Sequence, residues 1–204
     1  MMLGINFYEL FFNYILDFVK TYHIFGIFVL SFLETLFAPL PSEIVLPFAG
    51  YLAYINNSYF LLIISIIVGA LGNTLGSLPL YYLGYLGRGL VKKYGKYFFI
   101  SEKRLKIAEK WFNNNSFLTI FIFRFVPGFR SLISIPAGIF KTKMKLYLLL
   151  TFLGFLIWNS FLVSLGFFLG EYWEKSLEYS REIEIIAIVF VLVVIIYLIL
   201  KYLI

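Results

Sequence analysis

Long apolar segments, separated by short polar ones, recur along the whole chain. Residues 59–86 and 146–170 each exceed the roughly 20 apolar residues that a helix needs to cross the hydrocarbon core of a membrane. Residues 185–200 are almost purely aliphatic and predict a third span. Residues 1–22 form a shorter apolar run that carries two acids, so they predict a helix that lies at the membrane interface.

Two further apolar segments, residues 24–55 and 117–140, are interrupted by proline. Proline inside a helix removes a backbone hydrogen bond and clashes with the preceding turn. Each segment therefore predicts two short helices joined at a break, which is tolerated at membrane depth where protein or a cavity surrounds it. The residues expected at the breaks are Pro39, Pro41, Pro127 and Gly128.

The distribution of charge predicts which loops face the cytoplasm. Residues 87–116 contain eight lysines and arginines against two glutamates, and a second basic cluster occupies residues 141–145. By the positive-inside rule both are cytoplasmic. The segment between them must then enter and leave on the same side, as a re-entrant hairpin, and part of residues 87–116 predicts an amphipathic helix on the membrane surface. The acidic residues 171–184 suit the outer face, which places the C-terminus in the cytoplasm.

A weak internal repeat relates the two broken segments. At an offset of 88 residues, Phe37 and Pro39 align with Phe125 and Pro127, and the pair Ala49-Gly50 aligns with Ala137-Gly138. Each half would consist of a broken hairpin and a long span, inverted relative to the other half, as in many secondary transporters. The matched positions are few, so a chance similarity between two hairpins stays open. The predicted fold is a single all-α polytopic membrane domain, residues 1–204, with two opposed re-entrant hairpins and three to four spans.

Composition supports lipid as the main solvent of this chain and excludes several classes of site. Hydrophobic residues make up 62% of the chain and charged residues 14%, and the mean hydropathy is +0.92. The net charge of +6 comes from loops between apolar spans, where lipid headgroups explain it better than nucleic acid does. With no cysteine and a single histidine, His23, neither a disulfide nor a thiolate or imidazole metal site is expected.

Other polar residues near the breaks or inside the spans do not indicate an enzyme. Serines 42, 131 and 134 lie near the breaks, but they lack a histidine base or the spacing of a nucleophile elbow. Asn73 and Asn159 lie inside spans and are interpreted as cross-links between helices. No catalytic residue, cofactor or metal is predicted.

Four charged residues are expected at membrane depth, where each costs about 2.5–3.5 kcal/mol on insertion scales unless it faces a cavity or a partner. Arg124 and Arg130 flank the second break, and their planar, permanently charged guanidinium groups could converge on one phosphate. Glu34 and Glu43 flank the first break and are candidates for exchanging protons with the solvent. Structural ion pairs that hold the hairpins together without a ligand are the alternative.

The sequence around these residues resembles that of the DedA family, also known as the SNARE-associated or VTT-domain family. The resemblance covers the chain from about Phe28 to Gly170. The motifs that carry it are Glu34 with Pro39-x-Pro41-Ser42-Glu43, Gly69-x-x-Gly72, Tyr82-x-Gly84, and Phe123-Arg124-Phe125-x-Pro127-Gly128-x-Arg130 with Ala137-Gly138. The arginine motif is the most specific of them, whereas Ser42 departs from the glycine that many relatives have before the acidic residue.

The resemblance implies two opposed re-entrant hairpins and movement of lipids between leaflets. Bacterial relatives recycle the undecaprenyl phosphate carrier or translocate phosphatidylethanolamine, and dependence on the proton gradient has been proposed. The resemblance further implies that Arg124 and Arg130 bind the lipid phosphate and that Glu34 and Glu43 exchange protons. We interpret the chain as a multi-pass cell-membrane transporter of polyprenyl phosphate, with membrane lipids and protons as partners. Homo-oligomer formation stays open.

Three alternatives to this interpretation remain at this point. The first is a non-selective phospholipid scramblase or a phosphatidylethanolamine flippase, which needs a groove but no phosphate-specific site. The second is a proton-coupled antiporter of small ions. The third is a structural membrane protein that recruits partners through residues 87–116.

A cysteine at position 143 tests the predicted topology. Because Lys143 belongs to the cytoplasmic cluster, the Lys143→Cys variant should resist an impermeant thiol reagent in intact cells and react once the membrane is permeabilised. The chain has no cysteine of its own, so the background is low. Glu174→Cys, in the predicted outer loop, should react in intact cells. Labelling of position 143 from outside would mean that residues 117–140 cross the membrane.

Overall fold

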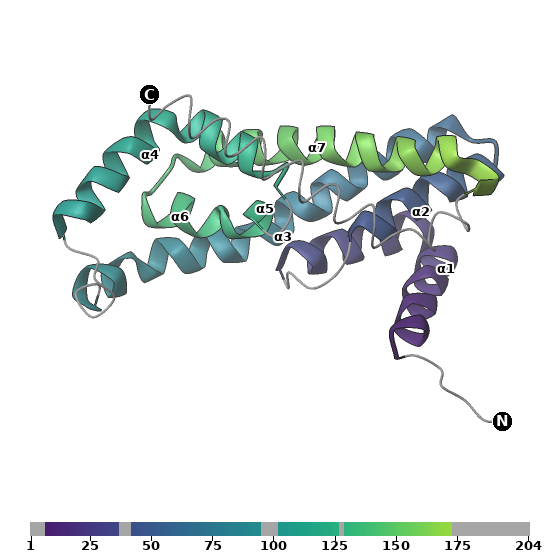
Figure 1. Cartoon of the computed structure of the whole chain (residues 1–204), viewed down its shortest axis with the longest axis horizontal. Coiled ribbons are helices and arrows are strands. Elements are labelled where there is room, and N and C mark those ends of the chain that lie inside the picture. Colours follow the sequence, from purple (N-terminus) through teal and green to yellow (C-terminus); the bar gives the residue numbers. More distant parts are fainter. Residues whose placement is uncertain (1–6, 37–41, 95–101, 127–128, 173–204) are drawn as a thin grey trace.

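The computed structural model of the chain describes residues 7–36, 42–94, 102–126 and 129–172, and within these ranges it is helical, without strands (Figure 1). The elements are α1 (Phe7–Leu36), α2 (Ser42–Ile55), α3 (Tyr59–Tyr94), α4 (Glu102–Phe123), α5 (Phe129–Leu132), α6 (Ser134–Ile139), α7 (Met144–Leu169) and the short 3-10 helix η2 (Gly170–Tyr172). The predicted all-α class is confirmed.

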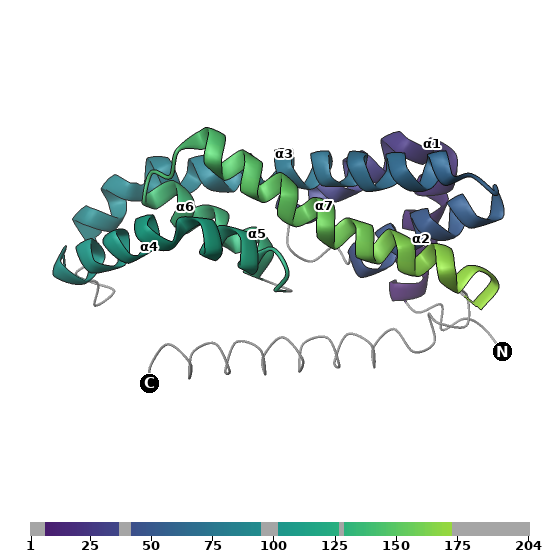
Figure 2. The ribbon, with the colours of Figure 1, turned by 90° about the horizontal axis from the view of Figure 1, so that it is seen from above.

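The long helices α3 and α7 run antiparallel and cross at the centre of the molecule (Figures 1 and 2). Three helical stretches in the described part are long and apolar enough to span a membrane: Tyr14–Leu36, Tyr59–Gly89 and Met144–Leu169. Tyr59–Gly89 and Met144–Leu169 coincide with the spans predicted at residues 59–86 and 146–170. The third predicted span, residues 185–200, lies outside the described residues.

Helix α1 is two helices joined at a backbone break. His23 has φ 45° and ψ −118°, outside the helical region, so the chain changes direction there. Figure 1 shows the N-terminal part of α1 standing across the other helices. The break falls where the predicted interfacial helix meets the predicted first hairpin, although the stretch Tyr14–Leu36 as a whole also has the length and composition of a span.

Helices end on both sides of each predicted proline break. α1 and α2 flank residues 37–41, while α4 and α5 flank residues 127–128. The expected break residues Pro39, Pro41, Pro127 and Gly128 themselves lie outside the described residues. Whether each helix pair enters and leaves the membrane on one side stays a prediction.

The helices of the two halves pack in a reciprocal manner. In each half the helix before the break lies against the long helix of the same half, so that α1 packs on α3 and α4 on α7. The helices after the break lie against the long helix of the opposite half, so that α2 packs on α7 and α6 on α3. Two apolar clusters fill these contacts, one around Leu46 and Val163 and one around Tyr81 and Ala137.

Glycines allow the backbones to touch at both crossings between the halves. A Cβ atom at Gly50 on α2 would lie 1.9 Å from the carbonyl oxygen of Val163, and one at Gly138 on α6 would lie 2.0 Å from that of Tyr81. The opposing helices contribute glycines as well, namely Gly166 on α7 and Gly84 on α3. Small residues allow such close approach between membrane helices. The Ala-Gly pairs that align in the sequence therefore occupy equivalent contacts in the structure.

Substitution of Gly138 tests how much stability this crossing contributes. Because the added methyl group of Gly138→Ala would meet backbone rather than a flexible side chain, the helices must separate, at a cost of about 1–3 kcal/mol. Thermal unfolding in detergent micelles should show the loss. Gly87→Ala on α3 is the matched control, since nothing lies within 4 Å of its added Cβ. Equal melting temperatures for both variants would contradict the close crossing.

Candidate functional site

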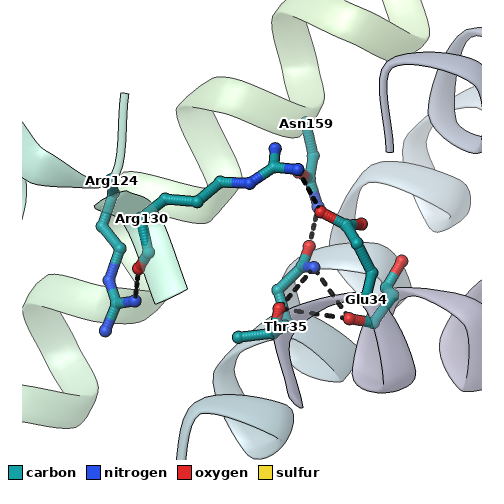
Figure 3. A network of polar contacts seen from close by, with 7 residues as sticks. Glu34, Thr35, Arg124, Arg130 and Asn159 are labelled. Atoms are coloured by element: carbon teal, nitrogen blue, oxygen red, sulfur yellow. Dashed lines mark hydrogen bonds and ion pairs between the residues drawn. The ribbon is translucent and has the colours of Figure 1, made fainter. Parts of the chain in front are cut away.

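Glu34 and Arg130 form an ion pair that connects the two broken segments (Figure 3). Glu34 lies near the C-terminal end of α1, and Arg130 lies in α5, just beyond the second break. Their side chains are only 4% and 10% exposed. Oε1 of Glu34 contacts Nη2 of Arg130. Two of the four charges expected at membrane depth are therefore buried against one another.

Arg124, which follows the last residue of α4, is fully buried and is held by oxygen atoms alone. Its guanidinium group donates to the backbone carbonyl of Arg130 and to three hydroxyl groups. The hydroxyl acceptors are Ser134 Oγ at 3.2 Å, Tyr147 OH at 3.3 Å and Thr151 Oγ1 at 2.8 Å. Within the described residues no carboxylate contacts this guanidinium group, so its charge is stabilised by dipoles.

Apolar groups and a glycine complete the surroundings of Arg124. The ring centres of Phe155 and Tyr147 lie 4.9 Å and 5.7 Å from its Cζ atom, within the range of a cation–π contact. Its stem lies against Gly154 of α7, where a Cβ atom would come within 2.9 Å of both Cβ and Cγ of the arginine. Nε has no acceptor among the described residues. The side chain is therefore closely packed against α7.

Tyr147 connects this arginine to the other half of the chain. Besides accepting from Arg124, its hydroxyl group donates to Ser77 Oγ at 2.8 Å, with the Ser77 carbonyl at 3.2 Å. Tyr147 is itself fully buried. Because Ser77 belongs to α3 and Tyr147 to α7, the two long helices are joined by hydrogen bonds beside Arg124.

A second polar connection lies beside Glu34. Asn73 of α3 donates through its side-chain amide to the carbonyl of Ser31 and to Thr35 Oγ1, each at 2.9 Å, and both acceptors are on α1. The side-chain amide group of Asn159 on α7 lies 3.0 Å from Asn73 Oδ1. Asn73 and Asn159 therefore cross-link three helices, as interpreted from the sequence, and Figure 3 shows these bonds beside the ion pair.

Comparison with known proteins identifies the family. The chain matches the VTT domain over residues 40–168. It belongs to the VTT-domain, or DedA, family. The matched region includes Arg124 and Arg130 and begins after Glu34. With its apolar helices, this VTT-domain chain is a membrane protein.

Three relatives illustrate the range of names within the family. An "Alkaline phosphatase-like protein" of Lactococcus lactis subsp. cremoris is 38% identical over 87% of this chain and 87% of its own length. "Undecaprenyl phosphate transporter A" of Bacillus subtilis is 36% identical over 74% of this chain and 77% of its own length. The protein of that name from Staphylococcus aureus is 29% identical over 92% and 94%. No solved structure matches the chain.

Among the predicted site residues of this VTT-domain protein, the structure brings Glu34 and Arg130 together. Arg124 is adjacent to Arg130, but the two guanidinium groups point in different directions (Figure 3). They do not converge on one point. The side chain of Glu43 lies outside the described part of the chain, so its predicted role is open.

The sequence interpretation named Ser134 near the second break but missed the other hydroxyl groups around Arg124, those of Tyr147 and Thr151, and Ser77 beside them. Tyr147 and Thr151 are four residues apart, which places them on one face of α7. Ser77 lies inside α3. Polar side chains on one face of an apolar span were the available signal, because such groups need a partner in lipid.

The ion pair is tested by removing one charge and then both. Glu34→Gln removes the carboxylate that Arg130 contacts and leaves a buried cation uncompensated, which costs about 3 kcal/mol. The double variant Glu34→Gln/Arg130→Gln removes that cation and should be more stable than Glu34→Gln alone. Unfolding in micelles measures both, with exposed Lys145→Gln as the control. Additive losses in the double variant would exclude a direct pair.

Proposed function

We propose that this VTT-domain protein moves a phosphate-bearing lipid between the leaflets of the membrane, with polyprenyl phosphate, such as undecaprenyl phosphate, as its substrate. Family membership supports membrane transport. The substrate class is supported by the two similar proteins whose names specify undecaprenyl phosphate transport. On this proposal the protein is a transporter and not an enzyme.

The observation that carries the proposal is the buried pair of Glu34 and Arg130. Carboxylate and phosphate oxygens occupy the same positions on a guanidinium group. In the proposed cycle a lipid phosphate replaces Glu34 on Arg130 and is itself replaced by Glu34 on the other side. Glu34 lies on α1, before the first break, and Arg130 lies on α5, after the second break. Loss of the ion pair would therefore loosen α1 from α5.

Proton coupling follows from the chemistry of the carboxylate. A protonated Glu34 no longer attracts Arg130 as an ion, so proton uptake favours the phosphate and proton release restores the pair. Glu43 is proposed to take part in the same exchange. The predicted contact of Arg124 with the phosphate requires its guanidinium group to leave the oxygen atoms that hold it in this structure.

The proposed architecture is a pair of opposed re-entrant hairpins related by an inverted repeat. It is supported by the equivalent glycine contacts of Gly50 with α7 and Gly138 with α3. In such an arrangement the breaks meet near the membrane midplane, where irregular backbone is enclosed by protein. The polyprenyl chain stays among the lipid tails throughout, so that only the phosphate needs a polar path.

Transport in reconstituted vesicles tests the function. The full chain in liposomes should move labelled polyprenyl phosphate faster than labelled phosphatidylcholine and phosphatidylethanolamine, and an imposed pH gradient should change that rate. Arg130→Ala should lower the rate at least about tenfold, because a charged hydrogen bond contributes about 1.5–3 kcal/mol. Lys145→Ala, which removes an exposed cation, is the matched control.

Each competing function predicts a different outcome of the vesicle assay. Equal movement of all lipids, unaffected by Arg130→Ala, would indicate a non-selective scramblase. Movement of small ions without lipid would indicate an antiporter, and no movement of either would indicate a structural role. If Glu34→Gln and Glu43→Gln left a gradient dependence unchanged, proton coupling through these residues would be wrong.

A further inference from the structure

The two arginines of the second break occupy different environments, and we infer different roles for them. We propose that Arg124 is a positioning residue that holds the backbone of Arg130 in register with Glu34, and that Tyr147 and Thr151 set its orientation. This inference rests on the proposed function, since it takes the pair of Glu34 and Arg130 as the site of phosphate exchange.

The first support is the bond between the two arginines. Nη1 of Arg124 donates to the backbone carbonyl of Arg130, the residue whose side chain reaches Glu34. Hydrogen bonds from a charged donor are stronger than neutral ones. Arg124 therefore restrains the backbone of Arg130, together with the bond from the Arg130 amide to the carbonyl of Val126, and so restrains the reach of the side chain.

The second support is the way in which the other nitrogen of Arg124 is held. Nη2 donates to three hydroxyl groups from two helices, Ser134 on α6 and both Tyr147 and Thr151 on α7. These neutral acceptors, with the carbonyl of Arg130, bind the two terminal nitrogens of the group without neutralising its charge. The terminal nitrogens of Arg124 are thus bound to neutral oxygen atoms, whereas Arg130 contacts the carboxylate of Glu34, an anion that a phosphate can replace.

The third support is the close packing around Arg124. Its exposed fraction is 0%. Gly154 allows the stem to lie directly on α7, and the rings of Tyr147 and Phe155 lie within cation–π distance of the guanidinium group. A side chain packed in this way holds its partner in one place, which is what a positioning residue requires.

Tyr147 extends the same connection to the first half of the chain. Its hydroxyl group bonds Ser77 on α3 as well as Arg124. A continuous series of contacts therefore runs from α3 through Tyr147, Arg124 and Arg130 to Glu34 on α1. The reach of Arg130 toward Glu34 then depends on the spacing of α3 and α7.

Conservative variants test this role, because Arg124→Ala itself risks misfolding. Tyr147→Phe removes one hydroxyl acceptor of Arg124, and Thr151→Val removes another. Ser160→Ala on α7 is the matched control, since Ser160 Oγ donates to the carbonyl of Leu156 in its own helix and has no other hydrogen bond within the described part of the chain. All variants are compared at equal amounts of folded protein.

The first measurement needs no substrate. In the cysteine-free chain, Glu34→Cys and Arg130→Cys are combined and cross-linked in membranes with a short bis-methanethiosulfonate reagent. Cross-linking should slow by about fivefold when Tyr147→Phe or Thr151→Val is added, since the rate follows the positioning of the two thiols. Ser160→Ala should leave it unchanged. An unchanged rate in both hydroxyl variants overturns the inference.

The second measurement is a double-variant cycle on transport of polyprenyl phosphate. Tyr147→Phe should lower transport about tenfold when residue 130 is arginine, and less than about twofold in the Arg130→Lys background, because a flexible lysine tolerates displacement of its backbone. Equal losses in both backgrounds overturn the inference and leave the function intact. A parent chain that moves no polyprenyl phosphate overturns the function, and the cross-linking result then decides the inference alone.

Discussion

A guanidinium group removed from water must be surrounded by oxygen atoms, and much of this molecule is arranged to supply them. Arg124 carries its charge into a site with no water-exposed surface. Four helical elements contribute to its surroundings, either directly or through Tyr147. Because each donor that lost its acceptor would cost free energy in a low-dielectric medium, this one side chain constrains the relative positions of α3, α5, α6 and α7.

The all-helical class, two of the three spans and the charged residues of the site could be predicted from the sequence. The length of an apolar segment, and the presence of a costly charged residue within it, can be read directly from the local sequence. The identity of the partners is not local, since Glu34 reaches Arg130 only because α1 and α5 are brought together by the packing of other helices. Two nearby arginines also look equivalent in a sequence, and their difference arises from the hydroxyl groups that surround one of them.

The break at His23 shows a further limit of sequence patterns. Neither proline nor glycine occupies this position, although glycine follows at Gly26, and the residue has a positive φ that the local sequence does not require. The predicted breaks, in contrast, had proline as a covalent cause. The alignment of Ala49-Gly50 with Ala137-Gly138 was informative because both glycines lie where two helix backbones touch. A side chain would not fit at either position, which explains why glycine occurs there.

The reciprocal packing of α2 on α7 and of α6 on α3 has a consequence for how the chain is made. Helix α2 reaches its contact surface only when α7 has been synthesised, because Gly50 packs on Val163 and Gly166 packs on Pro47. Helices α1 and α3, which also pack on α2, are synthesised before α7. Contacts between residues so distant in sequence slow folding, since a long loop must close before they form. The contact of α2 with α7 can therefore form only after the second long helix has entered the membrane.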